Sequence, residues 1–229
     1  MSFSNGPVVT TNGLVLSLDA GDRNSYVSGS TTWFDLAGTN NGTLTNGPTF
    51  NTGSFGSIVL DGTDDYIQTT ATNLNADIGT LNLWIKTGFA STDTRPYYFI
   101  DTRDNTNSNN ISVYYWQGGG GFVVWSGSAG TIISLTKTFS VNTYFMVTLI
   151  YNFVSDNYAL YLNGNLENSS TTSASSSGAM TKTTLGSRFN QAASEYFVGN
   201  IYSVQAYNRA LSASEVQQNY NALKGRFGL

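Results

Sequence analysis

The clearest pattern along the chain is the alternation of apolar and polar residues over short segments. In Gly79–Thr87, for example, Leu81, Leu83 and Ile85 occupy every second position, so that one face of the segment is apolar. A period of two is typical of a β-strand that buries one face and exposes or differently packs the other. The segment therefore predicts a strand within a sheet.

The segment from residue 144 to residue 167 predicts two consecutive hairpins. Tyr144–Asn152 consists mostly of β-branched, aromatic and aliphatic residues, which suit a central strand. The chain then turns back into Tyr158–Leu162 and reaches Asn163-Gly164, a pair that readily adopts the positive φ angles of a type I′ turn. We therefore predict an antiparallel meander in this part of the chain.

Further short apolar segments are bounded by Gly, Asn, Asp and Ser and predict the remaining strands. Together they give roughly a dozen strands, too many for one flat sheet, so we predict an all-β fold of two packed antiparallel sheets. The predicted strands lie in Leu14–Leu18, Ser57–Thr69 (a hairpin around Asp61–Asp64), Tyr97–Asp101, Ile111–Trp116, Phe122–Ser126, Ile132–Leu135, Thr181–Ser187 and Ile201–Ala206.

Other segments are predicted to be loops or a helix. Arg23–Phe55 is rich in loop-forming residues and predicts a covering loop, fixed to the core by a few apolar side chains, and Asn168–Gly178 predicts a mobile polar loop. Ser212 and Glu215 form a capping box, which predicts one short helix over residues 212–223. With an extended lead over residues 1–12 and no linker, residues 1–229 are predicted to form a single domain.

Composition excludes several functional classes. The chain has no Cys and no His, which excludes disulfides, thiolate or imidazole metal sites and Ser-His-Asp triads. A net charge of −4 without Lys or Arg clusters argues against nucleic acid as a partner. The first residues lack the features of a signal peptide and the apolar runs are too short to cross a membrane, so we expect a product made in the cytoplasm without membrane insertion.

Four segments in a fixed order carry a resemblance to a known family. They read IVLDGTDDYIQ, GTLNLWIKT, ALYLNGNLE and FVGNIYSVQAYNRALSASEVQQNY, and the similarity extends from Gly13 to Leu223. The chain resembles the laminin G-like, concanavalin A-like lectin and glucanase domains, which implies a jelly-roll sandwich. This fold hosts lectins, glycosidases, adhesion modules and scaffolds, so the resemblance specifies a fold more closely than a ligand.

The opening of the chain carries a second resemblance. The stretch FSNGPVVTTNGLVLSLDAGDRNSY, followed by TTWFDLAGTNNGTLTNGPTF, is similar to the N-terminal part of structural proteins of tailed bacteriophages. This resemblance implies a location on the virion, as a capsid decoration or a tail- or fibre-associated component. The partners it implies are other virion proteins, and a homotrimer follows from the analogy with decoration proteins.

The carboxylates do not form a glycosidase pattern. Glucanases of this superfamily place two Glu and an Asp at short alternate spacing on one strand, so that the acid and the nucleophile share a face. Here Glu167, Glu195 and Glu215 are far apart in the sequence, and the adjacent Asp64 and Asp65 would point to opposite faces of an extended strand. We therefore predict no catalytic residues and no enzymatic activity.

Calcium is the cofactor that the residue types would best accommodate. Asp61, Asp64 and Asp65 form the densest group of carboxylates, and hard oxygen ligands are those that Ca²⁺ prefers. The alternative is that these aspartates only stabilise a turn through neighbouring backbone amides. Both interpretations remain open from the sequence.

A sugar-binding surface needs aromatic faces beside polar groups. In Ile111–Trp116, Tyr114 and Trp116 point away from the apolar face, and Trp125 lies on the next predicted strand. The alternative is that these rings pack inside the sandwich or in a subunit contact; Trp33 and Trp84 are predicted to be core residues. The candidate glycan-binding residues are Tyr114, Trp116 and Trp125, with the polar Arg103 and Gln117 nearby.

These observations favour a non-catalytic structural module of a virion, which acts through protein contacts with glycan adhesion as an additional role. A carbohydrate-binding lectin that depends on Ca²⁺, held by Asp61, Asp64 and Asp65, is the alternative from a different class. A glycoside hydrolase is the third hypothesis, disfavoured by the missing carboxylate pair.

Overall fold

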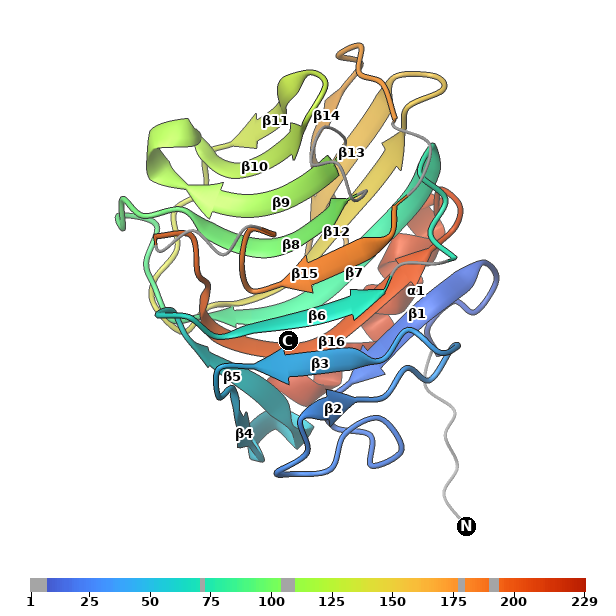
Figure 1. Cartoon of the computed structure of the whole chain (residues 1–229). Helices are drawn as coiled ribbons and strands as arrows, with labels where there is room; N and C mark the ends of the chain where they lie inside the picture. Colours follow the sequence, from blue (N-terminus) through green and yellow to red (C-terminus); the bar gives the residue numbers. More distant parts are fainter. Residues whose placement is uncertain (1–7, 71–72, 104–109, 177–179, 190–193) are drawn as a thin grey trace.

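Two antiparallel sheets pack face to face and form most of the molecule (Figure 1). The computed structural model of the chain describes residues 8–70, 73–103, 110–176, 180–189 and 194–229. Over these residues it is an all-β sandwich of two eight-stranded sheets with one short C-terminal helix, which confirms the predicted fold class.

Sheet A has its two longest strands at its centre. β7 (Ile78–Thr87) and β16 (Val198–Tyr207) pair there. β16 is long enough for two strands, β5 (Ser57–Asp61) and β1 (Leu14–Asp19), to pair with different parts of its other edge. The order across the sheet is β14 (Asn165–Ser170), β13 (Asn157–Leu162), β12 (Tyr144–Asn152), β7 (Ile78–Thr87), β16 (Val198–Tyr207), β5 (Ser57–Asp61) and β4 (Thr49–Asn51), with β1 (Leu14–Asp19) on β16.

Sheet B contains the other half of the strands and curves across the front of the molecule in Figure 1. Its neighbouring strands are also antiparallel throughout. The order is β11 (Gly130–Leu135), β10 (Gly121–Ser126), β9 (Asn110–Trp116), β8 (Tyr97–Arg103), β15 (Lys182–Leu185), β6 (Tyr66–Thr70), β3 (Gly42–Thr45) and β2 (Thr32–Trp33).

The main core lies between the two sheets. Leu81, Leu83 and Ile85 of β7 belong to the same buried cluster as Ile111 and Val113 of β9. Since side chains alternate along a strand, the residues between them point to the outer faces of the sandwich. The alternation predicted from the sequence is therefore confirmed in β7 and β9. In β16 (Val198–Tyr207) a bulge between Ile201 and Ser203 interrupts it and brings Ile201 into the core together with Val204 and Ala206.

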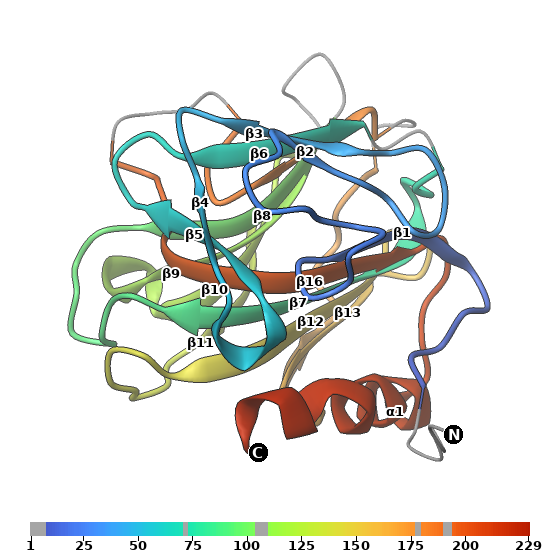
Figure 2. The ribbon, with the colours of Figure 1, turned by 90° about the horizontal axis from the view of Figure 1, so that it is seen from below.

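The outer face of sheet A is covered by the C-terminal segment. Helix α1 (Ala213–Leu223) and the short 3₁₀ helix η3 (Lys224–Phe227) lie below this sheet in Figure 2. The fully buried indole of Trp84 stacks on both Tyr220 and Phe227, with ring centroids 5.6 and 4.3 Å away. No helix among the described residues has the length and apolar character needed to cross a bilayer.

Two segments predicted as loops contain strands. Arg23–Phe55 contributes β2 and β3 to sheet B and β4 to sheet A, so it is part of both sheets rather than a covering loop. These strands have two to four residues, which is too short for a visible alternation. The predicted loop Asn168–Gly178 begins inside β14, and its last two residues lie outside the described part of the chain.

The hairpin predicted for Ser57–Thr69 is wrong. β5 pairs with strands of sheet A and β6 with strands of sheet B, so the turn around Asp61–Asp64 connects the two sheets. Turn residues show where the chain turns, but not which strands pair.

The turn at Asn163-Gly164 and the helix cap at Ser212 are confirmed. Asn163 and Gly164 both have positive φ angles, 53° and 80°, as a type I′ turn between β13 and β14 requires. Ser212 and Glu215 form a complete capping box at the start of α1. Each of these features rests on local backbone chemistry, which the sequence alone can show.

Glu215 is expected to make the attachment of α1 dependent on pH. Arg209 binds its carboxylate, and the backbone N–H of Ser212 adds a hydrogen bond; together they lower the pKa of Glu215 to about 2. A lowered pKa stabilises the folded state above the unfolded value of 4.5, and this contribution disappears as the pH falls toward 2. Glu215→Gln should therefore lower the free energy of unfolding by about 1 kcal/mol at pH 7.

Urea denaturation at several pH values measures this effect. The difference between wild type and Glu215→Gln should shrink between pH 4.5 and pH 2. A difference that stays constant over this range would contradict the assigned role of the carboxylate.

Candidate functional site

The candidate glycan-binding residues gather on the outer face of sheet B. β9 directs Ile111 and Val113 into the core, so Ser112, Tyr114 and Trp116 project from the opposite face. On β10, Val123 pairs with Tyr114 and Trp125 pairs with Ser112, which places both on the same outer face. We call Tyr98, Tyr114, Trp116, Val123 and Trp125 the aromatic face.

Tyr98 and Tyr114 form the centre of the aromatic face. Their rings stack at 4.4 Å between centroids with planes 15° apart, and Val123 and Trp125 pack beside them. Burial is the main cause that raises the pKa of both phenols, so they remain protonated at physiological pH. The centre is therefore a rigid, uncharged surface, and only its margin offers a large exposed ring.

Trp116 supplies that exposed ring. It ends β9 and is 40% exposed, although a large aromatic residue normally prefers burial. A Cβ atom added to Gly118 would lie 2.9 Å from Cε2 of Trp116, and one added to Gly119 would lie 2.6 Å from Cε3. The indole therefore lies against the backbone of these two glycines, which fixes its orientation.

The four consecutive glycines have separate physical roles. Gly118 and Gly119, in the 3₁₀ helix η2 (Gln117–Gly119), leave room for the indole. Gly120 and Gly121 have φ angles of 92° and 104°, which side-chain-bearing residues rarely adopt, and a Cβ atom on Gly121 would collide with the carbonyl oxygen of Leu135. The sequence GGGG is thus a support for Trp116 followed by a tight entry into β10.

Polar groups lie beside this support. The exposed Gln117 borders a pocket of about 250 Å³ that also contains Tyr115 and Lys137. The hydroxyl-bearing residues Ser91, Thr92, Thr136 and Thr138 complete its polar lining. Trp116 thus directly precedes, in the chain, a residue that lines a small pocket with several hydroxyl groups, and aromatic rings together with such polar groups are expected for carbohydrate recognition.

The structure places Arg103 differently from its predicted role in ligand contact. Its guanidinium group is buried, donates two hydrogen bonds to Asp101 through Nε and one through Nη2, and lies 3.7 Å from the ring centroid of Phe189. Asp101 also accepts hydrogen bonds from Asn110, Ser112 and the backbone N–H of Phe189. Arg103 therefore stabilises this face as part of a buried hydrogen-bond network rather than contacting a ligand.

Three residues near the aromatic face were not found from the sequence. Tyr98 lies between Tyr97 and Phe99, which are also apolar, so the alternation does not show which side chain points outward; an irregularity in the β8–β9 register decides it. Arg188 and Glu195 form an ion pair of 3.3 Å that influences the pKa of both Tyr98 and Tyr114. No local motif predicts that this pair comes close to β8 and β9.

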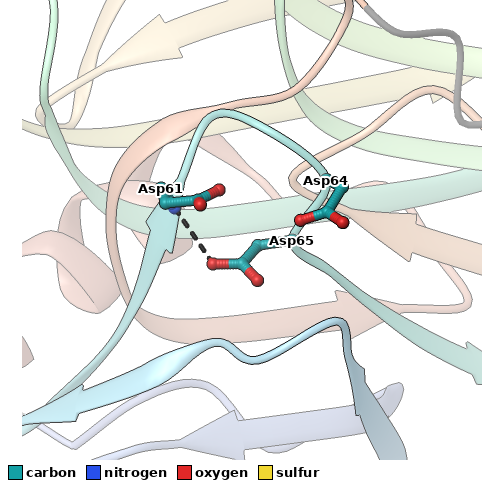
Figure 3. Close-up of side chains that lie close together, drawn as sticks. All are labelled: Asp61, Asp64 and Asp65. Atoms are coloured by element: carbon teal, nitrogen blue, oxygen red, sulfur yellow. Dashed lines mark hydrogen bonds between the residues drawn. The ribbon is translucent and has the colours of Figure 1, made fainter.

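The three aspartates predicted as calcium ligands do come together at the turn between β5 and β6 (Figure 3). One carboxylate oxygen of each lies within 4.8 Å of the others. Asp61 and Asp64 are exposed, whereas Asp65 is buried and Oδ2 of Asp65 accepts a hydrogen bond from the backbone N–H of Asp61. Burial is the main cause that raises the pKa of Asp65, and the charges of Asp61 and Asp64 raise it further.

This geometry is compatible with both interpretations of the aspartates. Oxygen ligands lie about 2.3–2.6 Å from Ca²⁺, so three oxygens within 4.8 Å of one another can surround one ion. However, Oδ1 of Asp61 accepts a hydrogen bond from the backbone N–H of Thr63, which is the turn stabilisation expected without any ion. If Ca²⁺ binds here, it would be held by the carboxylates of Asp61, Asp64 and Asp65, and its role would be to fix this turn.

Comparisons with solved structures show the same architecture. Trypanosoma rangeli sialidase in complex with 2,3-difluorosialic acid superposes with a TM-score of 0.72 at 14% identity, over 95% of this chain and 34% of the sialidase. Domain 4 of AbnA, a GH43 extracellular arabinanase from Geobacillus stearothermophilus, in complex with arabinotriose, gives 0.71 at 19% identity, over 90% and 98% of the two chains. The chain thus spans about a third of the sialidase.

Sequence comparison gives the family. No curated protein matches the chain. The family model described as the concanavalin A-like lectin/glucanases superfamily matches residues 61–217, which include the turn with the three aspartates, the aromatic face and the start of α1. With its sandwich of two antiparallel sheets, the chain belongs to the concanavalin A-like lectin/glucanase superfamily.

Proposed function

We propose that this chain is a non-catalytic module that binds glycan on the outer face of sheet B, with Trp116 as the stacking platform. The observation that carries the proposal is the exposed indole held in a fixed orientation by Gly118 and Gly119. A sugar ring presents an apolar C–H face that can cover such an indole, while Gln117 offers hydrogen bonds beside it. The arabinanase domain of the same fold, whose structure contains arabinotriose, supports an oligosaccharide as the ligand.

The state of the carboxylates on this face supports binding without catalysis. Most glycoside hydrolases use two carboxylates that are free to donate or accept a proton or to attack the sugar. Both oxygens of Asp101 are occupied by donors from Arg103 and its neighbours, and Glu195 is paired with Arg188. These bonds hold the negative charges in place as structural groups.

A calcium-dependent form of this function is the second candidate. It is favoured by the convergence of Asp61, Asp64 and Asp65 at one turn. An ion there would stabilise the connection between β5 in sheet A and β6 in sheet B, which is a structural role rather than a direct contact with sugar.

We further propose that the module works on the particle of a tailed bacteriophage, as a capsid decoration or a tail- or fibre-associated component. The support is the resemblance of the segment before residue 51 to structural proteins of such phages. Its partners would be other virion proteins together with a cell-surface glycan, and its assembly a homotrimer by analogy with decoration proteins.

Replacing Trp116 tests the glycan site. Trp116→Ala should weaken binding to the best ligand of a glycan array by roughly 10-fold or more, because about 1.4 kcal/mol of stacking and apolar burial is lost. Gly119→Ala should weaken binding as well, since its Cβ atom would displace the indole without removing it. Isothermal titration calorimetry measures both effects.

Two control variants separate binding from folding. Val154→Ala removes an exposed apolar residue from the turn between β12 and β13 and should leave affinity unchanged. Trp116→Phe keeps an aromatic ring at this position and should retain part of the affinity. Unchanged binding by Trp116→Ala, or an array on which no glycan binds, would refute the proposal.

Replacing Asp65 tests the turn with the three aspartates. In buffer with chelator at pH 7, Asp65→Asn should raise the free energy of unfolding by roughly 0.5–1 kcal/mol, because a buried carboxylate next to two others is removed. The raised pKa of Asp65 means that wild type loses this penalty as the pH falls, so the difference should shrink in acid. Asp22→Asn is the matched control on an aspartate outside the cluster.

Thermal denaturation with millimolar CaCl₂ completes this experiment. An ion bound by the three aspartates should raise the melting temperature of wild type and not that of Asp65→Asn. A wild-type melting temperature that does not respond to CaCl₂ would exclude the calcium-dependent candidate. A loss of stability in Asp65→Asn with chelator would contradict the repulsion argument.

The location on the virion is tested on purified particles. We expect mass spectrometry of washed virions to detect the chain, and analytical ultracentrifugation of the isolated protein to give the mass of a trimer. Absence of the chain from particles would refute the location without affecting the glycan site, and a monomer would refute only the analogy with decoration proteins.

A further inference from the structure

A second, separate pocket lies at the opposite edge of the sandwich from the aromatic face. It has a volume of about 470 Å³ and adjoins another of about 350 Å³, with which it shares Tyr26, Ser28 and Phe50. Residues of the loop after β1, of β4 and of the 3₁₀ helix η1 (Gly53–Phe55) line it. Figure 1 shows β4 at its lower left. β4 is the outermost strand of sheet A on this side, whereas β9 and β10 lie toward the β11 edge of sheet B.

The pocket combines apolar rings with hydroxyl groups. Tyr26 and Phe50 pack against each other with ring planes tilted by 38° and centroids 5.2 Å apart, and Phe55 extends the apolar wall. Ser28 and Thr52 contribute hydroxyl-bearing side chains to the same lining. The volume lies within the range of roughly 300–1,000 Å³ of small-ligand sites, and the mixture of rings and hydroxyls suits a sugar ring.

Both the side-chain exposure and the backbone conformation of Phe55 are unfavourable. Its side chain is 71% exposed, and its φ angle is +67°, in the left-handed region that an aromatic L-residue seldom adopts. Ser54, the preceding residue, also has a positive φ of 52°. Asn or Gly would fit this backbone with less strain, and neither would place an aromatic ring at the mouth of the pocket.

Close backbone packing keeps Phe55 in this conformation. A Cβ atom on Gly21 would lie only 2.2 Å from the carbonyl oxygen of Phe55, and one on Gly56 only 2.6 Å from the carbonyl oxygen of Ala20. The two chain segments therefore interlock through Gly21 and Gly56. Backbone strain that the surroundings enforce in this way is characteristic of binding sites.

The charge of the pocket indicates the ligand. Arg23 is the single charged residue in its lining, is exposed, and has no hydrogen bond or ion pair with another described residue. The nearby Asp19 is already paired with Arg226, and Oδ1 of Asp22 accepts a hydrogen bond from the backbone N–H of Asn24. The unpaired guanidinium is suited to a bidentate contact with a carboxylate.

We propose that this pocket is a second glycan site, which binds an acidic sugar unit such as a hexuronate. The apolar face of the sugar ring lies on Phe55 and Phe50, the carboxylate meets Arg23, and the adjoining pocket accepts the neighbouring sugar. The site is independent of the Trp116 platform, because the two share no residue.

Matched acidic and neutral trisaccharides test this site by isothermal titration calorimetry. Trimers of galacturonate and mannuronate differ from trimers of galactose and mannose chiefly in the C6 carboxylate, so at least one acidic trimer should bind 10-fold or more tightly than its neutral counterpart. Arg23→Ala should remove this preference and Arg23→Lys should restore part of it, since Lys keeps the charge without the bidentate geometry.

Phe55→Asn gives a readout that a purely structural role would not produce. Asn tolerates a positive φ, so the variant should have a melting temperature equal to or above that of wild type, yet bind the acidic trimer at least 10-fold more weakly. Trp116→Ala should leave acidic-trimer binding unchanged, which separates this site from the Trp116 platform.

The proposal would be overturned if neither acidic trimer binds or if the neutral trimers bind as tightly as the acidic ones. It would also be overturned if Phe55→Asn leaves the affinity for the acidic trimer unchanged. Loss of acidic-trimer binding in Trp116→Ala would also overturn it, because the acidic sugar would then bind at the Trp116 platform. Array binding that depends on Trp116 alone would support the first site while refuting this one.

Discussion

The stacking of Trp84 on Tyr220 and Phe227 attaches the C-terminal segment to sheet A, and so determines which outer face of the sandwich stays uncovered by it. A two-sheet sandwich has two outer faces. Apolar side chains on each face are either covered by another part of the chain or available for binding. In sheet A, α1 and η3 cover the outer face, with the Trp84 indole at the centre of the contact. Of the two outer faces of the sandwich, the aromatic face of sheet B is therefore the one that carries an exposed ring, Trp116, among the described residues.

The same structure explains why charged groups on sheet B act as supports. Asp101 and Arg103 are buried beside each other, and such a pair is stable only when its hydrogen-bonding groups are satisfied. Asn110 and Ser112 on β9 supply donors to Asp101, and Phe189 covers Arg103. These bonds connect β8 and β9 next to the aromatic rings on the same outer face, and so fix the shape of this surface.

Glycine has an unusual importance in this chain because it positions exposed aromatic rings. Gly118 and Gly119 support Trp116, and Gly21 and Gly56 lock the backbone that carries Phe55. In both places a side chain on the glycine would force a ring or a backbone carbonyl to move. Rings that are fixed before a ligand arrives lose little conformational freedom on binding, and this favours affinity from a small contact.

Sequence alone determined the features that depend on near neighbours in the chain: the alternation in β7 and β9, the Asn163-Gly164 turn, the capping box at Ser212, and the shared face of Tyr114 and Trp116. Only the tertiary structure decided that Arg103 is buried, that Tyr98 stacks on Tyr114, that Arg23–Phe55 enters both sheets, and that Phe55 borders a pocket with Tyr26. Periodicity and turn chemistry act over a few residues, whereas these contacts join segments distant in the chain or depend on strand register. A pattern of side chains shows which face a residue occupies, but only the packed sheets show what lies against that face.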